Sequence, residues 1–283
     1  MCATNSPTAS GAATVPATVI TGASEGIGLA LARKFLTKGH TVVAVARNSE
    51  KLADALAGLA PMVQAQHRLL SLPLDVTDTD AAARIAGMLA DNGLYLDVLI
   101  NNAGIGLGGP FASQAPADVD RLVALNIAAL TRLTHAAVAT MLQQGRGHII
   151  NMASLGGYAP GPNQAAYYAS KAFVISLSEA LSSELARGGV KITVVAPGPV
   201  DTGFHATMNA DDAFYRRLLP ALTADQVAAA TYRGYRLGLR VVVPGIFNRG
   251  LMLAMRLLPH PITVPLTGWL LAPRSHVRPY SHR

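Results

Sequence analysis

The feature that most constrains the fold of this chain is a regular alternation between short apolar runs and longer segments with helical periodicity. The apolar, β-branched runs predict buried strands at residues 17–21, 41–46, 68–74, 96–100, 148–151 and 190–196. The segments between them predict helices at residues 29–38, 50–59, 79–91, 118–143 and 164–187. Because such apolar strands need cover on both faces, this order predicts a parallel sheet between two layers of helices, a doubly wound α/β fold with three layers.

The length and composition fit one large domain with two appendages. A chain of 283 residues, 51% hydrophobic and 14% charged, can bury a sizeable core. We expect residues 1–14, which lack the basic and apolar regions of a signal peptide, to be a disordered tail. Residues 15–246 are expected to form the domain and residues 247–283 a short, helical C-terminal extension. The single cysteine, Cys2, excludes an intrachain disulfide and fits a reducing, cytoplasmic location.

A glycine-rich turn follows the first predicted strand directly. It reads Thr21-Gly22-Ala23-Ser24-Glu25-Gly26-Ile27-Gly28, and a helical pattern that Gly39 is expected to cap follows it. Glycine adopts positive φ angles and lets a phosphate approach the backbone, while the N-terminal amides of the new helix point at that phosphate. In this strand–turn–helix setting, the turn predicts a dinucleotide-binding site and a sheet of the Rossmann type.

Polar or turn-forming residues fall where five predicted strands end. They are Gly22, Asp75, Asn101, Ser154 and Pro197. The carboxyl ends of parallel strands share one edge of the sheet, which is where the ligands of such sheets bind. We therefore expect these positions to meet around one site.

The segment from Asn151 to Lys171 carries the candidates for acid–base chemistry. Tyr167 and Lys171 are four residues apart on a predicted helix, so both side chains leave from one face. An ammonium group beside a phenol favours the phenolate and lowers the pKa of the phenol from about 10, toward the pH at which a proton donor works best. Ser154 offers a hydroxyl to the same point. A lone pair of this kind is common on solvated helix faces, so its weight comes from the accompanying motifs.

Together these motifs resemble the short-chain dehydrogenase/reductase family over residues 17–243. The Gly22 loop is similar to the loop that binds the cofactor in this family, and Asp75-Val76 is similar to the pair on the adenine side. Asn101-Asn102-Ala103-Gly104 is similar to the turn beside the adenosine. Residues 197–202 are similar to the segment that holds the nicotinamide carboxamide. The positions that match the catalytic residues of the family are Asn126, Ser154, Tyr167 and Lys171.

The resemblance implies a role for each of these four residues. Tyr167 would donate a proton to a carbonyl oxygen while nicotinamide delivers hydride to the carbon, and Ser154 would orient that oxygen. Lys171 would bind the ribose hydroxyls and depress the pKa of the tyrosine. Asn126 would hold a water that links Lys171 to solvent.

The end of the second predicted strand bears on the choice of cofactor. A site that prefers NAD usually has a carboxylate there, whereas this strand ends in Arg47 and Asn48. Arg47 can pair with a 2′-phosphate, and Ser24 and Asn48 can add hydrogen bonds, so we predict NADP(H). The alternative is that Arg47 is a solvated loop charge. The expected cofactor contacts are Gly22, Ser24, Glu25, Gly26, Ile27, Gly28, Arg47, Asn48, Asp75, Val76, Asn102, Ala103, Gly104, Tyr167, Lys171, Pro197, Gly198, Val200 and Thr202.

Other side chains near these motifs have simpler explanations. Tyr168 lacks a lysine four residues on, so we expect it to pack, whereas Tyr158 can either line the substrate site or be a plain loop aromatic. His135 and His148 have no second ligand at metal spacing, so we expect structural roles and no metal site. Glu179 is expected on a solvated or inter-helix face.

The segment after the last motif is irregular and then helical again. In the family that the chain resembles, residues 202–220 form a mobile lid, and the apolar content here (Phe204, His205, Met208, Phe214 and Tyr215) suggests a hydrophobic substrate. Residues 223–238 predict a helix with Thr223 as N-cap, and residues 240–245 predict the last strand.

The C-terminal extension is open to three interpretations. Residues 251–258 predict a short amphipathic helix, after which Pro259, Pro261 and Pro265 are expected to break the chain. The apolar run 264–271 is too short and too broken to span a bilayer. It can cap the substrate pocket, pack in an oligomer, or rest on a membrane interface with Trp269 and Arg274 as anchors.

The charge distribution limits the kinds of partner. The net charge is +7, and the excess lies late in the chain. The basic residues are scattered without interleaved aromatic residues, so we expect no nucleic-acid partner and keep a peripheral membrane contact as a minor hypothesis.

The sequence therefore predicts an NADP(H)-dependent oxidoreductase that interconverts a ketone and a secondary alcohol. Similar reductases with such C-terminal tails often act on lipid-like ketones, so the resemblance implies a fatty or steroid-like carbonyl as the first substrate to expect. One alternative is a non-catalytic NADP(H)-binding regulator, which would need only the Gly22 loop and Arg47. Another is an epimerase or dehydratase on the same fold. The resemblance also implies a homodimer or homotetramer that pairs the helices at 118–143 and 164–187.

Overall fold

The computed structural model of the chain describes residues 15–63, 67–204, 208 and 220–272. The predicted tail at residues 1–14 lies outside the described residues. The same is true of His205, Phe214 and Tyr215 of the expected lid, and of Arg274.

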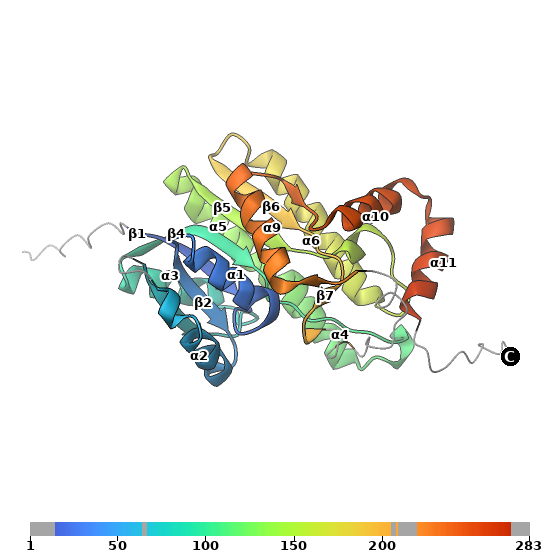
Figure 1. The fold of residues 1–283 in the computed structure, drawn as a ribbon, viewed down its shortest axis with the longest axis horizontal. Coiled ribbons are helices and arrows are strands. Elements are labelled where there is room, and N and C mark those ends of the chain that lie inside the picture. Colours follow the sequence, from blue (N-terminus) through green and yellow to red (C-terminus); the bar gives the residue numbers. More distant parts are fainter. Residues whose placement is uncertain (1–14, 64–66, 205–207, 209–219, 273–283) are drawn as a thin grey trace, which may run out of the picture.

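Within the described residues, seven parallel strands form the central sheet in the order β3-β2-β1-β4-β5-β6-β9 (Figure 1). Their bounds are β1 Val15–Thr21, β2 Thr41–Ala46, β3 Leu69–Pro73, β4 Leu94–Asn101, β5 Gly147–Met152, β6 Val190–Val195 and β9 Val241–Val242. A separate parallel pair consists of β7, Val200–Asp201, and β8, Leu222–Thr223. This arrangement confirms the predicted doubly wound α/β fold.

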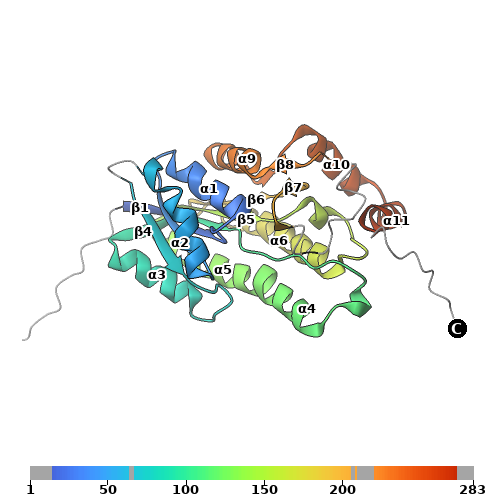
Figure 2. The same ribbon diagram turned by 60° about the horizontal axis from the view of Figure 1, so that its bottom comes forward.

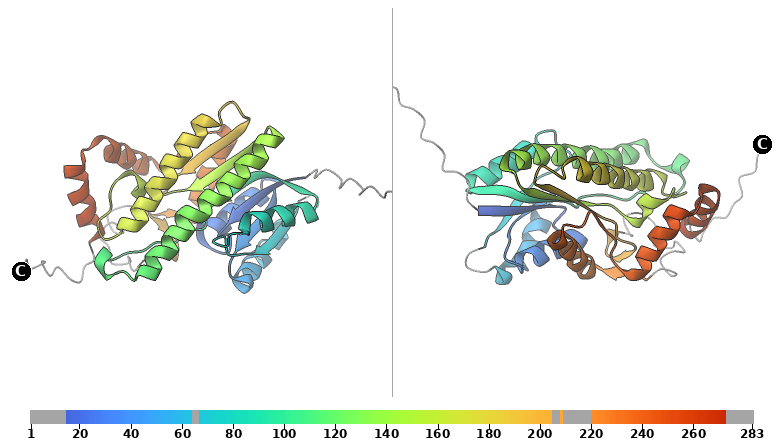
Figure 3. Two further views of the ribbon diagram at one scale, coloured as in Figure 1. Left: turned by 180° about the vertical axis from the view of Figure 1, so that it is seen from behind. Right: turned by 90° about the horizontal axis from the view of Figure 1, so that it is seen from above.

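Helices cover both faces of the sheet (Figures 2 and 3). One layer contains α1 Gly26–Leu36, α2 Ser49–Ala57 and α9 Ala224–Leu237, whose apolar residues share one core cluster with the sheet. The opposite layer contains α3 Ala81–Asp91, α5 Leu130–Gln144 and α6 Ala165–Glu184. Short 3₁₀ turns lie at Ala60–Met62, Phe111–Ser113 and Leu155–Tyr158.

The strands are apolar throughout because alternate residues enter different halves of the core. All six residues of β2 are buried. Val42 and Ala44 pack under the layer of α1, and Val43 and Val45 pack under the layer of α3. A strand with solvent on one face would have shown polar residues at every second position.

The helix predicted at 118–143 is one continuous helix from Pro116 to Gln144 with a π-helical turn inside it. The parts are α4 Pro116–Val123, the turn Ala124–Ala129 and α5. The length and apolar composition alone would suit a membrane span. Its inner side chains Leu133, Ala137 and Met141 are instead buried against the sheet, which is typical of a core helix.

Several helix ends differ from the prediction. Helix α1 begins at Gly26, within the glycine turn, and its C-cap is Thr37 rather than Gly39, which takes a φ of +84° in the turn that follows. Helix α9 has Thr223 as N-cap with a complete capping box, as predicted for residues 223–238.

The C-terminal extension is more helical than the prolines suggested. It consists of α10, Ile246–Leu257, and α11, His260–Leu271, which project from one end of the domain (Figure 1). The predicted break occurs only at Pro259. Pro261 is in the first turn, where its missing N–H needs no partner, and Pro265 is accommodated inside the helix.

His148 is a buried structural residue that makes the fold sensitive to acid. Its Nε2 lies 2.8 Å from the Thr193 hydroxyl, which itself donates to the Leu239 carbonyl and so accepts from the imidazole. Burial, and to a lesser degree Lys191, lowers the pKa of His148 to about 4. The unfolded chain, with a histidine pKa near 6.5, therefore binds this proton first as the pH falls.

We predict that replacing His148 with glutamine removes part of the acid sensitivity. The stability that His148 contributes is present above about pH 6.5 and is lost as the pH falls toward 4, by roughly 2 to 3 kcal/mol. Urea unfolding at about pH 7.5 and about pH 4.5 measures this loss for the wild type and for His148→Gln. Other groups titrate equally in both proteins. Equal losses of unfolding free energy would contradict the prediction.

Candidate functional site

One large cavity runs along the carboxyl edge of the sheet. Its volume is about 920 Å3, and every residue expected to contact the cofactor lines it. It lies where strand order reverses, because β1 pairs with β2 on one side and with β4 on the other. Such a reversal leaves a crevice between the loops on the two sides, which is where doubly wound sheets bind ligands.

The glycine turn forms a floor of exposed backbone at one end of the cavity. Gly22 and Gly26 take φ angles of +67° and +53°, which side chains disfavour. A Cβ on Gly28 would lie 1.9 Å from the Gly22 carbonyl oxygen and 2.6 Å from the Asn102 side-chain nitrogen. These glycines keep the first turn of α1 open to a close approach, and the residues therefore fit the pyrophosphate of a dinucleotide.

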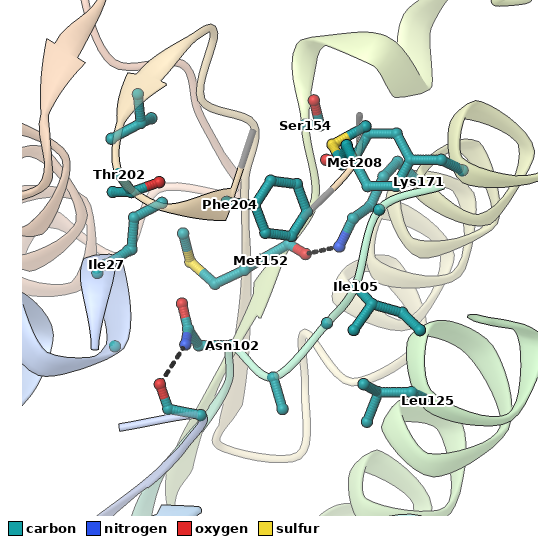
Figure 4. A pocket seen from close by; sticks show the side chains of 18 of the residues that line it. Ile27, Asn102, Ile105, Leu125, Met152, Ser154, Lys171, Thr202, Phe204 and Met208 are labelled. Atoms are coloured by element: carbon teal, nitrogen blue, oxygen red, sulfur yellow. Dashed lines mark hydrogen bonds between the residues drawn. The ribbon is translucent and has the colours of Figure 1, made fainter. Parts of the chain in front are cut away.

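A hydrogen-bond network ties this turn to the end of β4. The Thr21 hydroxyl accepts from the backbone amides of Asn102 and Ala103, both at 3.0 Å. The Asn102 amide nitrogen donates to the carbonyls of Thr21 and Gly22 (Figure 4). Because both partners are at strand ends, the network holds the floor of the cavity in one conformation.

Charged residues gather at the end of the cavity beyond β2 and β3. Arg47, with a side chain 74% exposed, lies 3.8 Å from the Asp75 carboxylate, and Lys51 lies 2.7 Å from that of Glu25. Partial burial alone would raise the pKa of Asp75, but two hydrogen bonds from Thr77 and the Arg47 charge lower it. Asn48 caps α2 through the Lys51 amide, so its side-chain oxygen is already used. Lys51, which the sequence analysis missed, adds a second cation one helical turn after Arg47.

Ser154, Tyr167 and Lys171 meet at the other side of the same cavity. The Lys171 ammonium donates to the Met152 carbonyl at 3.0 Å (Figure 4). It lies 5.8 Å from the centre of the Tyr167 ring. It is only 6% exposed, and this burial lowers the pKa of Lys171 to about 8. The Ser154 hydroxyl accepts from the Gly156 amide at 3.1 Å. Tyr167 thus has a buried cation close to its ring, and the Ser154 hydroxyl lines the same cavity.

Asn126 lies behind this group rather than in the cavity wall. It is buried in the π-helical turn, and its side-chain amide accepts from Ile105 N and donates to Ile105 O, at 2.9 and 2.8 Å. The same amide donates to the Ser170 hydroxyl at 3.2 Å. A Cβ on Gly104 would lie 3.2 Å from the Asn126 oxygen and 3.5 Å from Lys171 Nζ, so the two side chains are close neighbours.

The remaining part of the cavity is mainly apolar and receives the C-terminal extension. Phe204 and Met208 cluster with Tyr167, and Met208 fills the space left open by Gly106 and Gly108. Further apolar or weakly polar lining comes from Leu251, Met255, Thr267, Leu270 and Leu271. The lining of this part also includes the polar side chains of Asp118, Arg121 and Gln164. Arg121 forms a salt bridge with Asp118 at 3.3 Å. The sequence analysis had left the place of the extension open.

Of the other candidate side chains, Tyr168 lines the cavity, whereas Tyr158 and Glu179 do not. Tyr168 packs against Leu271, as expected of a packing residue, but it also lines the cavity. Tyr158 is absent from the lining and packs in the core cluster beneath α10, with the Arg256 guanidinium 5.3 Å from its ring centre. Glu179 forms an inter-helix salt bridge with Arg256 at 3.2 Å.

Comparison with known proteins gives a consistent result. The family model described as short chain dehydrogenase matches residues 16–213. A short-chain dehydrogenase from Sphingobium yanoikuyae in complex with NADPH is 32% identical, with 82% of this chain and 88% of that chain covered and a TM-score of 0.74.

Two further solved structures share this fold. The bulky-bulky ketone specific alcohol dehydrogenase from Comamonas testosteroni is 29% identical (87% of this chain, 95% of that chain, TM-score 0.70). A short chain dehydrogenase/reductase from Burkholderia phymatum in complex with NAD is 26% identical (93% of this chain, 99% of that chain, TM-score 0.76). The match over most of the domain, the strand order and the glycine turn agree, and the chain belongs to the short-chain dehydrogenase/reductase family of NAD(P)-dependent oxidoreductases.

Proposed function

We propose that this protein is an NADP(H)-dependent oxidoreductase that interconverts a hydrophobic ketone and the corresponding secondary alcohol. The observation that carries the proposal is that Tyr167 and Lys171 face the cavity between its glycine floor and its apolar end. A carbonyl placed beside Tyr167 would have its apolar substituents in contact with Phe204, Met208 and the extension.

Each side chain then has a defined task. The nicotinamide cofactor, when bound, supplies or accepts the hydride. Tyr167 donates its phenolic proton to the carbonyl oxygen in reduction and takes it back in oxidation. The Ser154 hydroxyl donates a hydrogen bond to the same oxygen and stabilises the charge that develops there. The Lys171 ammonium favours the phenolate form of Tyr167, and Asn126 positions the backbone at Ile105 beside it.

The preference for NADP(H) is supported by the charges at the adenosine end. Strand β2 ends at Ala46 and is followed by Arg47, without the carboxylate that would accept hydrogen bonds from a ribose 2′-hydroxyl. Arg47 is exposed enough to turn toward a 2′-phosphate, and its 3.8 Å contact with Asp75 is too long for a hydrogen bond that would hold it. Solved relatives contain NADPH in one case and NAD in another, so the choice depends on such local residues.

The proposal includes self-association through the long helices. Helix α6 and the helix formed by α4 and α5 lie side by side on the outside of one layer (Figure 3). They expose Val123, Leu142 and Phe173. A homodimer or homotetramer would bury these side chains.

We predict that Tyr167→Phe lowers kcat/KM by at least about a hundredfold, because the proton donor is lost. The binding of NADPH, followed by its fluorescence, should change little. Tyr168→Phe is the matched control, since Tyr168 lines the same cavity without a lysine four residues on, and it should retain most of the activity. Ketones and alcohols of graded size, followed by NADPH absorbance, provide the assay. Full turnover by Tyr167→Phe would exclude the proposed mechanism.

For Lys171→Met, we predict loss of turnover together with a gain in stability. The lowered pKa shows that burial penalises the ammonium, so removing it should raise the free energy of unfolding by roughly 1 to 3 kcal/mol at neutral pH. The folded-state pKa of about 8 is below the unfolded value of 10.5, so the penalty is relieved as the pH rises through this window. The difference between variant and wild type should therefore shrink above about pH 8. A less stable variant at neutral pH would contradict this account.

Replacing Arg47 with alanine tests the cofactor preference. We expect the ratio of kcat/KM with NADPH to kcat/KM with NADH to fall at least about tenfold, since a charge-assisted contact with the 2′-phosphate is lost. Lys51→Ala is the control, and it should have a smaller effect because Lys51 is already paired with Glu25. An unchanged ratio in Arg47→Ala, or a wild-type preference for NADH, would show that the assignment is wrong.

A further inference from the structure

The two helices of the C-terminal extension expose a group of large apolar side chains. They are 38% to 83% exposed, and we call them the C-terminal apolar face: Ile246, Phe247, Leu253, Leu257, Leu258, Ile262, Leu266 and Trp269. On α10, Ile246, Leu253 and Leu257 follow one another at helical spacing and so form a stripe. Large apolar side chains exposed in this number on two consecutive helices are typical of an interaction site.

Helix α11 shows that this exposure is not incidental. Its buried stripe consists of Thr263, Thr267 and Leu271, whereas Ile262, Leu266 and Trp269 occupy its exposed side. The Thr267 hydroxyl is satisfied within the protein, since it donates to the Pro160 carbonyl at 2.7 Å. A helix that faced only water would have the opposite distribution. The outer side of α11 is therefore suited to an apolar environment.

The charged side chains of the sequence from α10 onward have one sign. The last acidic residue of the sequence is Asp225, and eight arginines follow it. Two of them, Arg249 and Arg256, are on α10, where Arg256 is paired with Glu179 of α6. Three more, Arg274, Arg278 and Arg283, belong to the eleven residues that follow α11 after Ala272. A second copy of the chain would therefore bring arginine-rich segments together, whereas an anionic surface would attract them.

We propose that the C-terminal apolar face docks on an anionic lipid bilayer. The apolar stripes of α10 and α11 would enter the region between headgroups and acyl chains, and the arginines of α10 would contact the headgroup phosphates. Trp269 would lie at the interface, where tryptophan is favoured. The domain itself would remain in water, because the sheet and its helices contain their own core.

Docking would also place the cavity next to the membrane. The inner side of α11 contributes Thr267, Leu270 and Leu271 to the cavity wall, so this helix separates the bilayer from the substrate end of the cavity. This step rests on the proposed function: a hydrophobic ketone or alcohol dissolved in the bilayer would reach Tyr167 without crossing bulk water.

Vesicle binding by the full chain, without cofactor or substrate, tests the docking separately from turnover. The chain has a single tryptophan, Trp269, so its emission reports on the proposed surface alone. With vesicles of equimolar phosphatidylcholine and phosphatidylglycerol, we expect the protein to sediment with the lipid and its emission to shift to the blue. Vesicles of phosphatidylcholine alone, or high salt, should weaken the binding because the attraction is partly electrostatic.

A double substitution on the C-terminal apolar face supplies the matched test. Leu257→Gln with Leu266→Gln should weaken binding to the mixed vesicles at least about tenfold, whereas Leu237→Gln, at a similarly exposed position on α9, should not. Thermal unfolding and sedimentation velocity establish that each variant is folded and report its oligomeric state. Absence of binding by the wild type, or equal binding by the double variant, would overturn the proposal. So would a change of oligomeric state in the double variant with vesicle binding unchanged, which would assign the face to a second copy.

Discussion

A buried ammonium group constrains the site more than any other interaction. Lys171 has lost most of its contact with water, and its described hydrogen bond is to the Met152 carbonyl at the end of β5. A charge in such a place is costly unless its surroundings are rigid and polar. Helix α6 must therefore be held against the strand ends, and the Asn126 amide contributes by joining Ile105 to Ser170 in the turn before Lys171. The same rigidity fixes Tyr167 relative to the cation.

The parallel sheet explains how distant segments meet around this group. The Thr21 hydroxyl and the Asn102 amide link the ends of β1 and β4, and Lys171 reaches the end of β5. Each contact is made at a strand end, where backbone amides and carbonyls are no longer all used by the sheet. The cavity is therefore built from backbone groups that the fold leaves available, and the glycines prevent side chains from covering them.

Much of this arrangement could be predicted from the sequence because it depends on local patterns. The strand ends at Gly22, Asp75 and Ser154 are recognisable from apolar runs and turns, and the i,i+4 spacing places Tyr167 and Lys171 on one face. Contacts between distant segments could not be predicted in this way. The π-helical turn around Asn126 depends on the Ile105 backbone, and the continuous helix through Pro265 depends on packing against the Pro160 loop. Periodicity contains no information about either partner.

Both the local sequence pattern and the contacts between distant segments are needed to understand the C-terminal extension. Its sequence shows apolar residues around nearly the whole circumference of α11, a pattern that by itself fits a buried helix as well as an interfacial one. The structure distinguishes the buried side of α11 from the exposed side. Thr267 and Leu271 point toward the cavity, whereas Ile262 and Leu266 point away from the protein. The inner side of α11 thus packs on the domain and lines the cavity, whereas its outer side makes no such contribution to the domain. The outer surface gains nothing from folding, because it stays in contact with water, and it favours association; a partner that covers it would remove this apolar area from water.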